Sequence, residues 1–230
     1  MKNFFAVLGG MGSIATESFV RRLNSKTVAE RDQDYCNFVV FNDASVPDRT
    51  AYLLGESDAN PVPYIVEDIK QVASLGPDFI VLTCNTAHAF FEDFKAASDV
   101  ELLHMPYLAV KKICEEFPRA KRIGFLGTEG SLKSRVYEDA IEAEGLEFVV
   151  PEYELQVKVN YLIYHEVKER GILNEKLYHE IMSELKDVDV IILGCTELSA
   201  VEEDSREHPY TVIDAQEVLV DECLKRMKGN

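Results

Sequence analysis

The stretch FIVLTCNTAHAFF, Phe79 to Phe91, joins an apolar run to a polar corner and then to a helical pattern. A continuous apolar run of this length is typical of a buried strand. The polar residues that follow fall where a helix begins and its first N–H groups lack partners. A helix N-terminus lowers the pKa of a thiol, so Cys84 lies where the reactive thiolate forms easily. The stretch therefore predicts strand, reactive corner and helix, although Cys84 would also suit a structural role as a small buried hydrophobic residue.

Length and composition favour a globular α/β protein. The chain has 230 residues, 47% of them hydrophobic, which suits one large α/β domain or two small ones. Its formal charge of -17 would repel a phosphate backbone, so we do not expect nucleic acid as a partner. The sequence has no apolar run of the roughly 18 residues that span a bilayer, and MKNFFAVLGGMG lacks a small-residue cleavage site. We therefore expect a cytoplasmic protein that does not bind membranes.

The cysteines do not form a disulfide or zinc pattern. Five are present, at positions 36, 84, 114, 195 and 223, and none forms a C-x-x-C pair. The five histidines show no metal-ligand spacing either, and we interpret them as structural or surface groups. We expect reduced thiols and no bound metal.

Strand and helix patterns alternate along the whole chain. This alternation predicts parallel sheets with right-handed crossovers. The polar segment from Ala44 to Pro63 interrupts it, and loops of this length are often functional. A single helix is expected from Leu155 to Arg170, closed by Gly171. The expected strands lie near residues 4–10, 36–43, 79–83, 101–105, 121–128, 147–150, 188–194 and 211–214.

An internal repeat relates the two halves of the chain. AVLGGMGSIATES (6–18) resembles GFLGTEGSLKSRV (124–136), and FIVLTCNTA (79–87) resembles VIILGCTEL (190–198). The two expected lobes are related by pseudo-symmetry, and each is a mostly parallel sheet flanked by helices. We expect residues 1–103 and 211–230 in the first lobe and residues 104–210 in the second. Ligands bind outside the carboxyl ends of parallel strands, so the repeat predicts that two cysteines face one ligand.

Two opposed thiols can invert a stereocentre. A thiolate removes the α-proton of a small carbon acid on one face, and a thiol returns a proton on the other. No metal is required. Backbone N–H groups at helix starts can stabilise the charge that develops on the substrate carboxylate. The candidates are Asn85, Thr86, Thr196 and the turn from Gly10 to Ser13, in which Met11 would line the cleft.

Four motifs together carry a family resemblance. LGGMG (8–12), PDRTAYLL (47–54), TCNTAHAF (83–90) and GCTE (194–197) resemble the aspartate racemase branch of the cofactor-independent aspartate/glutamate racemase family. The match runs in order through nearly the whole chain. Cys-Asn-Thr alone is a weak signal, whereas two cysteine corners with the Pro-Asp-Arg-Thr loop are specific.

The resemblance implies roles for four residues. Cys84 and Cys195 would be the two catalytic bases, Arg49 would bind one substrate carboxylate, and Lys168 would bind the distal one. It also implies an isomerase that acts on a dicarboxylic amino acid without a cofactor, as a homodimer. A guanidinium can hold a carboxylate with two parallel bonds. Without the resemblance, Arg49 would be interpreted as a solvated loop charge and Lys168 as a surface charge on an amphipathic helix.

The chain departs from the glutamate racemase branch of this family at two places. That branch carries Asp-Ser where this chain has Gly10-Met11-Gly12, and a histidine where this chain has Glu197. These differences favour aspartate over glutamate as substrate. Glu197 could bind the ligand amine, tune Cys195 by repulsion of the thiolate, or serve as a first-turn helix acid, and its role stays open.

Other hypotheses account for less of the sequence. Residues 10–15 match the G-x-G-x-x-A dinucleotide fingerprint, but the second strand ends too far along the chain to supply its acid, and the paired cysteines stay unexplained. A non-catalytic dicarboxylate-binding protein would keep Arg49 and Lys168 but would not need both thiols. A sister reaction stays open, such as a glutamate or broad-specificity racemase or a maleate isomerase.

Overall fold

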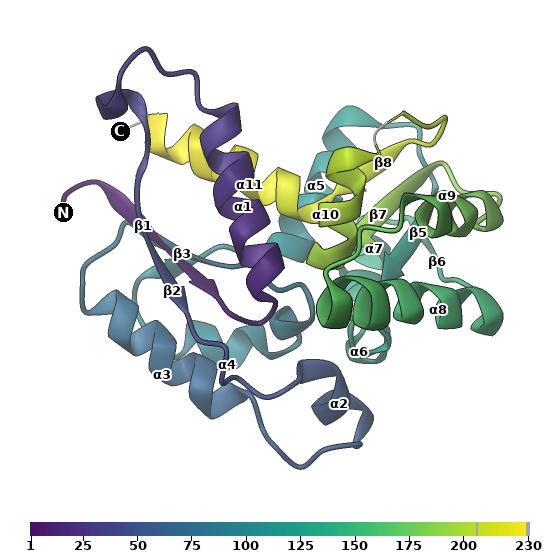
Figure 1. The fold of residues 1–230 in the computed structure, drawn as a ribbon, viewed down its shortest axis with the longest axis horizontal. Helices are drawn as coiled ribbons and strands as arrows, with labels where there is room; N and C mark the ends of the chain where they lie inside the picture. The colour runs from purple at the N-terminus through teal and green to yellow at the C-terminus, as the bar shows by residue number, and fades with distance from the viewer. Residues whose placement is uncertain (206, 229–230) are drawn as a thin grey trace.

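Two four-stranded parallel sheets organise the chain (Figure 1). A computed structural model describes residues 1–205 and 207–228. The first sheet has the order β2-β1-β3-β4 and the second the order β6-β5-β7-β8, so the second half of the chain repeats the arrangement of the first. The strands are β1 (Phe4–Gly9), β2 (Asn37–Asn42), β3 (Phe79–Leu82), β4 (Glu101–Leu102), β5 (Arg122–Gly127), β6 (Glu147–Val149), β7 (Val190–Gly194) and β8 (Val212–Asp214). The expected two-lobed α/β fold with parallel sheets is confirmed.

Helices flank both sheets. Those of the first half are α1 (Ser13–Lys26), η1 (Asp32–Asp34), α2 (Arg49–Leu54), α3 (Val62–Ala73), η2 (Thr86–Phe90), α4 (Phe91–Lys95) and α5 (Met105–Glu116). Those of the second half are α6 (Glu129–Ser134), α7 (Val136–Ala143), α8 (Tyr153–Asn160), η3 (Tyr161–Glu169), α9 (Glu175–Glu184), α10 (Thr196–Asp204) and α11 (Ala215–Lys228). In the part of the chain that is described, no helix has the length and apolar character needed to cross a membrane.

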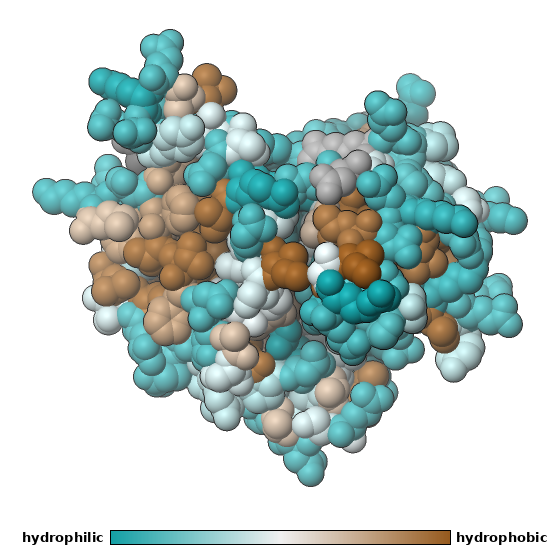
Figure 2. Space-filling view, viewed as in Figure 1, coloured by the Kyte–Doolittle hydropathy of each residue, from teal (hydrophilic) through white to brown (hydrophobic). Residues whose placement is uncertain are grey.

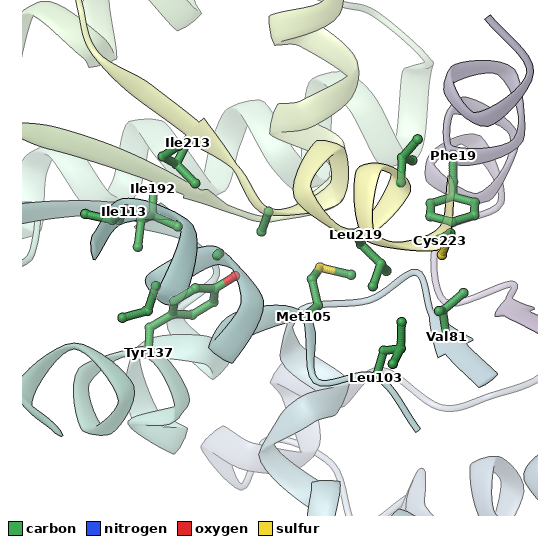
Figure 3. Packing of buried hydrophobic residues seen from close by; sticks show 14 of the residues in the cluster. Phe19, Val81, Leu103, Met105, Ile113, Tyr137, Ile192, Ile213, Leu219 and Cys223 are labelled. Carbon is green, nitrogen blue, oxygen red and sulfur yellow. The ribbon is translucent and has the colours of Figure 1, made fainter. Parts of the chain in front are cut away.

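One hydrophobic core is shared by both sheets. Successive side chains of a strand point to opposite faces. Phe5 and Val7 of β1 therefore pack on one side with Ile192 of β7, while Ala6 and Leu8 pack on the other side against α3. Helices α5 and α11 fill the space between the sheets, and Met105 lies near the centre of this core in Figure 3. The lobes are therefore joined by buried apolar contact and not by a linker alone.

The last strand joins the second sheet. β8 pairs with β7 in parallel, with Ile191 opposite Val212. We expected residues 211–230 to belong to the first lobe, so this placement of Val212–Asp214 is a correction. Helix α11 follows directly and packs on both α1 and α5. The sequence shows a strand here, but its partner depends on a long-range register that a short apolar run does not specify. The rest of the expected division into lobes stays a prediction.

The expected helix from Leu155 to Arg170 is not uniform. It is an α-helix to Asn160 and a π-helix, η3, from Tyr161 to Glu169. π-Helical turns are rare and are frequent at functional sites. Lys168 lies within this π-helix.

On the face shown in Figure 2, hydrophilic side chains predominate, and the largest hydrophobic group lies over the region of β1 and β2, with smaller groups toward the second lobe. Strand β2 is the edge strand there, and its Val40 is 41% exposed. An edge strand has unpaired backbone groups along one side.

A buried ion pair ties helix α1 of the first lobe to the end of β8. Arg22 is 2% exposed and donates to Asp214 and to the carbonyl oxygen of Ser199. Its Nε lies 3.2 Å from Glu203 Oε2. Its neighbour Arg21 also reaches Glu203, at 3.1 Å, but its side chain is 47% exposed.

We expect Arg22→Met to lower the free energy of unfolding by about 3–5 kcal/mol, because Asp214 would stay buried without its partner. The matched control Arg21→Met should cost about 0–1 kcal/mol, since exposed pairs contribute little. Urea unfolding of the two variants checks this. Equal losses in both would show that the buried pair does not join the lobes.

Candidate active site

A small cavity lies where the carboxyl ends of the two sheets face each other. About 260 Å³ of empty space, including some open to solvent, lies between its lining residues. All eight residues singled out from the sequence line this cavity, so the structure brings them together. The lining consists of Met11, Asp48, Arg49, Thr50, Cys84, Asn85, Thr86, Thr128, Lys168, Cys195, Thr196 and Glu197. Asp48 and Thr50, from the Pro-Asp-Arg-Thr motif, and Thr128, from the internal repeat, also line the cavity, although the sequence assigned them no role.

The first cysteine corner follows β3. Cys84 is 6% exposed, and the helix after it is a short 3₁₀-helix, η2. His88 lies one turn on, and its Nδ1 is 2.9 Å from the carbonyl oxygen of Cys84. Its Nε2 accepts the backbone N–H of Met105 at 3.2 Å, which leaves the ring proton on Nδ1. Burial, together with nearby His104, lowers the pKa of His88 to about 3, so the ring is neutral and clamps the corner to α5.

The second cysteine corner follows β7. Cys195 is the N-cap residue of α10, and its side chain is buried. Its Sγ lies 2.9 Å from Oε2 of Glu197, and Thr196 Oγ1 lies 3.4 Å from the same oxygen. Burial and the Glu197 carboxylate raise the pKa of the Cys195 thiol well above its ordinary value, although Lys168 opposes this effect. The two corners therefore share a fold but differ in their charged neighbours.

Arg49 is a buried cation held over the cavity. It begins α2, where the side chain of Asp48 caps the helix by accepting the N–H of Ala51 at 2.8 Å. Its Nη1 donates to the carbonyl of Pro47 at 3.0 Å, and its Nη2 donates to that of Met11. Burial lowers the pKa of Arg49, but Cys84, within hydrogen-bonding reach, and the nearby carboxylates more than offset this, so its pKa lies above the usual value. Its Nε is buried and has no partner among the described residues.

Lys168 reaches the cavity from the π-helix η3. Its Nζ lies 3.8 Å from Oε1 of Glu197 and 4.7 Å from the centre of the Tyr164 ring. Burial lowers the pKa of Lys168, but attraction by Glu197 and Cys195 more than offsets this effect. The pKa therefore lies above its usual value, and the ammonium stays charged. The residue is therefore not the surface charge that its helical context alone suggested.

Asn85 offers a second unpaired donor. Tyr137 of α7 is fully buried and donates its hydroxyl to Oδ1 of Asn85. This contact orients the amide so that Nδ2, which is buried, has no partner in the described ranges. Buried polar groups are almost always paired in native proteins, so Asn85 Nδ2 and Arg49 Nε together point to a ligand acceptor group. Tyr137 was missed because an aromatic residue in an amphipathic helix is usually interpreted as core.

Hydroxyl groups join the lobes beside Asn85. Thr86 Oγ1 lies 2.9 Å from Thr128 Oγ1 and 3.0 Å from Ser131 Oγ, so it contacts the start of α6 in the other lobe. Within the described ranges, no group of three or more His, Cys, Asp or Glu side chains is arranged to hold a metal ion.

The sequence model of one protein family, described as Asp/Glu/Hydantoin racemase, matches residues 8–223. The chain belongs to the Asp/Glu/Hydantoin racemase family. The resemblance inferred from the four motifs is therefore confirmed, and the chain is placed among isomerases.

The proteins similar to this chain are named as racemases of different amino acids. The broad specificity amino-acid racemase RacX of Bacillus subtilis is 29% identical over 217 residues, which cover 85% of this chain and 86% of RacX. A glutamate racemase of Aquifex aeolicus is 29% identical over 152 residues, 60% of this chain and 58% of that one. The structure of Picrophilus torridus aspartate racemase has a TM-score of 0.84 at 27% identity and covers 98% of this chain and 94% of its own. These likenesses establish a racemase of this family and leave its substrate open.

The neutral state of His88 has a consequence for stability. The unfolded chain takes up a proton on this histidine near pH 6.5, whereas the folded state does so only near pH 3. The unfolded state therefore binds more protons between these values, and stability falls as the pH is lowered from 6.5.

We expect the free energy of unfolding to drop by about 2 kcal/mol more between pH 7.5 and 5 in the wild type than in His88→Gln. Glutamine keeps an acceptor for the N–H of Met105 but does not titrate. Denaturant unfolding at the two pH values checks this. An unchanged pH dependence in the variant would contradict the neutral, buried histidine.

Proposed function

We propose that this protein is an aspartate racemase that interconverts L- and D-aspartate with Cys84 and Cys195 as its two bases. The observation that carries the proposal is that these two cysteines, one from each sheet, line a single small cavity. A thiolate on one face of the α-carbon takes its proton, and a thiol on the other face gives one back. One proton leaves and one is added, so the net change is inversion alone. No cofactor is part of this scheme.

The donors of the cavity suit a carboxylate. Within the described residues, Arg49 Nε and Asn85 Nδ2 are buried and have no hydrogen-bond partner. Such preorganised donors stabilise the charge that moves onto the α-carboxylate when the proton leaves. Lys168 and the helix start at Thr196 would hold the distal carboxylate, with Met11 and Thr86 completing the wall. Arg49 and Lys168 thus supply positive charge in a protein whose formal charge is -17.

Aspartate is favoured over glutamate by two observations. Gly10-Met11-Gly12 and Glu197 stand where the glutamate racemase branch carries Asp-Ser and a histidine. The similar structure from Picrophilus torridus, at 27% identity, is that of an aspartate racemase. A homodimer and a cytoplasmic location stay predictions of the family resemblance.

Deuterium exchange tests substrate and reaction together. L-aspartate, D-aspartate, L-glutamate and D-glutamate are each incubated with the protein in D2O without added cofactor and followed by proton NMR and chiral chromatography. We expect both aspartate enantiomers to gain α-deuterium and to reach a racemic mixture, with glutamate at least about tenfold slower. Equal turnover of glutamate would identify a broad-specificity racemase, and no exchange in any substrate would contradict the proposal.

Serine variants test the two-base assignment. Cys84→Ser and Cys195→Ser should each reduce racemisation by about 10²–10⁴-fold, because a serine hydroxyl is a far weaker acid than a thiol and does not ionise near neutral pH. Cys114→Ser on α5 is the matched control and should retain full activity, since Cys114 lies outside the cavity. Full turnover in both cavity variants would rule out the paired thiols as the bases.

A further inference from the structure

We propose that Glu197 holds Cys195 in its protonated form, so that the free enzyme rests with the thiolate on Cys84 and the thiol on Cys195. This inference rests on the proposed function, because it assigns the starting base and the starting acid of that reaction. Glu197 would then be a positioning residue for the proton of Cys195 and not a ligand of the substrate.

The contact between Cys195 and Glu197 has one chemical direction. Sγ and Oε2 are 2.9 Å apart, and both side chains are buried. An ionised carboxylate accepts hydrogen bonds and cannot donate, so the hydrogen belongs to the sulfur. A thiolate at this place would face a carboxylate at contact distance with little water to screen the repulsion.

Other groups around Cys195 do not reverse the preference for the thiol over the thiolate. The ammonium of Lys168, from η3, favours a thiolate, but it lies 3.8 Å from Oε1 of the same carboxylate, which already takes up part of its charge. Tyr164 from η3 and Tyr137 from α7 also face this region, and burial raises the pKa of each phenol, so both stay neutral. The net effect on Cys195 is a raised pKa, led by burial and by Glu197.

The Glu197 carboxylate lies against the turn before α1. A Cβ atom built on Gly12 would lie 2.6 Å from Oε1 of Glu197, and Gly12 has a φ of 152°. Only glycine fits this conformation and this contact. Thr196 holds the other oxygen, Oε2. The absence of a side chain at Gly12 thus leaves room for Oε1 of Glu197 beside the turn.

Cys84 has the opposite neighbourhood. Arg49 lines the same cavity as Cys84, and the carbonyls of Met11 and Pro47 hold its guanidinium there. The ring of His88, bonded to the Cys84 carbonyl, is neutral and adds no charge. A fixed cation beside a sulfur favours the thiolate. The two cysteines, equivalent in the fold, are thus inequivalent in charge.

The proton transfers balance in this state. The Cys84 thiolate takes the α-proton and becomes a thiol, while the Cys195 thiol gives its proton to the other face and becomes a thiolate. That thiolate faces Glu197, so the product form of the enzyme is the less stable one. Water can return it to the resting state by moving one proton from Cys84 to Cys195.

Thiol alkylation in the absence of substrate tests the inference. The wild-type protein is treated with iodoacetamide from pH 5 to 10, and the rate at each cysteine is followed by peptide mass spectrometry. The midpoint of each pH profile reports the thiolate and does not depend on access. We expect the Cys84 midpoint to lie at least about one pH unit below that of Cys195. A Cys195 midpoint equal to or below that of Cys84 would overturn the proposal without any variant.

Two glutamine variants test whether the charge of Glu197 is what raises the alkylation midpoint of Cys195. Glu197→Gln keeps the shape of the side chain and removes its charge, so the Cys195 midpoint should fall by about 1 pH unit while that of Cys84 stays unchanged. Glu202→Gln is the matched control on the same helix, because Glu202 is also buried but bonds to Tyr178 instead of facing the cavity. It should leave both midpoints in place. An unmoved Cys195 midpoint in Glu197→Gln would overturn the role of Glu197.

The racemase assay separates this inference from the proposed function. If the protein racemises aspartate but the alkylation midpoints of Cys84 and Cys195 are equal, the role of Glu197 is overturned and the proposed reaction stands. The expected midpoint difference without any α-deuterium exchange would support the charge asymmetry and contradict the reaction.

Discussion

Parallel pairing of the central strands determines where the two cysteines lie. β1 pairs with β3, and β5 pairs with β7, so each cysteine corner sits at the carboxyl end of a buried strand. The shared core then holds the two sheets against α5 and α11, with the corners turned toward one cavity. If either pairing shifted by one residue, every core side chain of that strand would change face. The position of the site is therefore a consequence of the core.

Charged side chains make the two cysteine corners of the pseudo-symmetric fold different. Arg49 and Lys168 are cations with little exposure, and such burial is unfavourable unless partners offset it. Glu197 and carbonyl oxygens are the partners in the unliganded protein. Among the described residues of the cavity lining, buried donors on Arg49 and Asn85 have no partner, and a carboxylate ligand would satisfy them. The cation of the first corner and the carboxylate of the second are what distinguish Cys84 from Cys195.

Much of this arrangement could be predicted from the sequence. Alternating strand and helix patterns and the repeated cysteine corners indicated two lobes with parallel sheets. The family resemblance assigned Arg49 and Lys168 to the site. Other features depend on contacts between distant segments. The pairing of β8 with β7 needs a register that Val212–Asp214 alone does not encode, and the π-helix η3 looks like an ordinary amphipathic helix in sequence. The bond from Tyr137 to Asn85 crosses from one lobe to the other, so no local pattern marks it.

A crystal structure of the Cys84→Ser variant with aspartate bound tests the two-thiol arrangement most directly. The hydroxyl introduced at position 84 and Sγ of Cys195 should lie on opposite faces of the ligand α-carbon, each about 3–3.5 Å away. The α-carboxylate should accept bonds from Arg49 Nε and Asn85 Nδ2. A ligand whose α-carbon lies beyond reach of Cys195, or with both groups on the same face, would contradict inversion by these two cysteines.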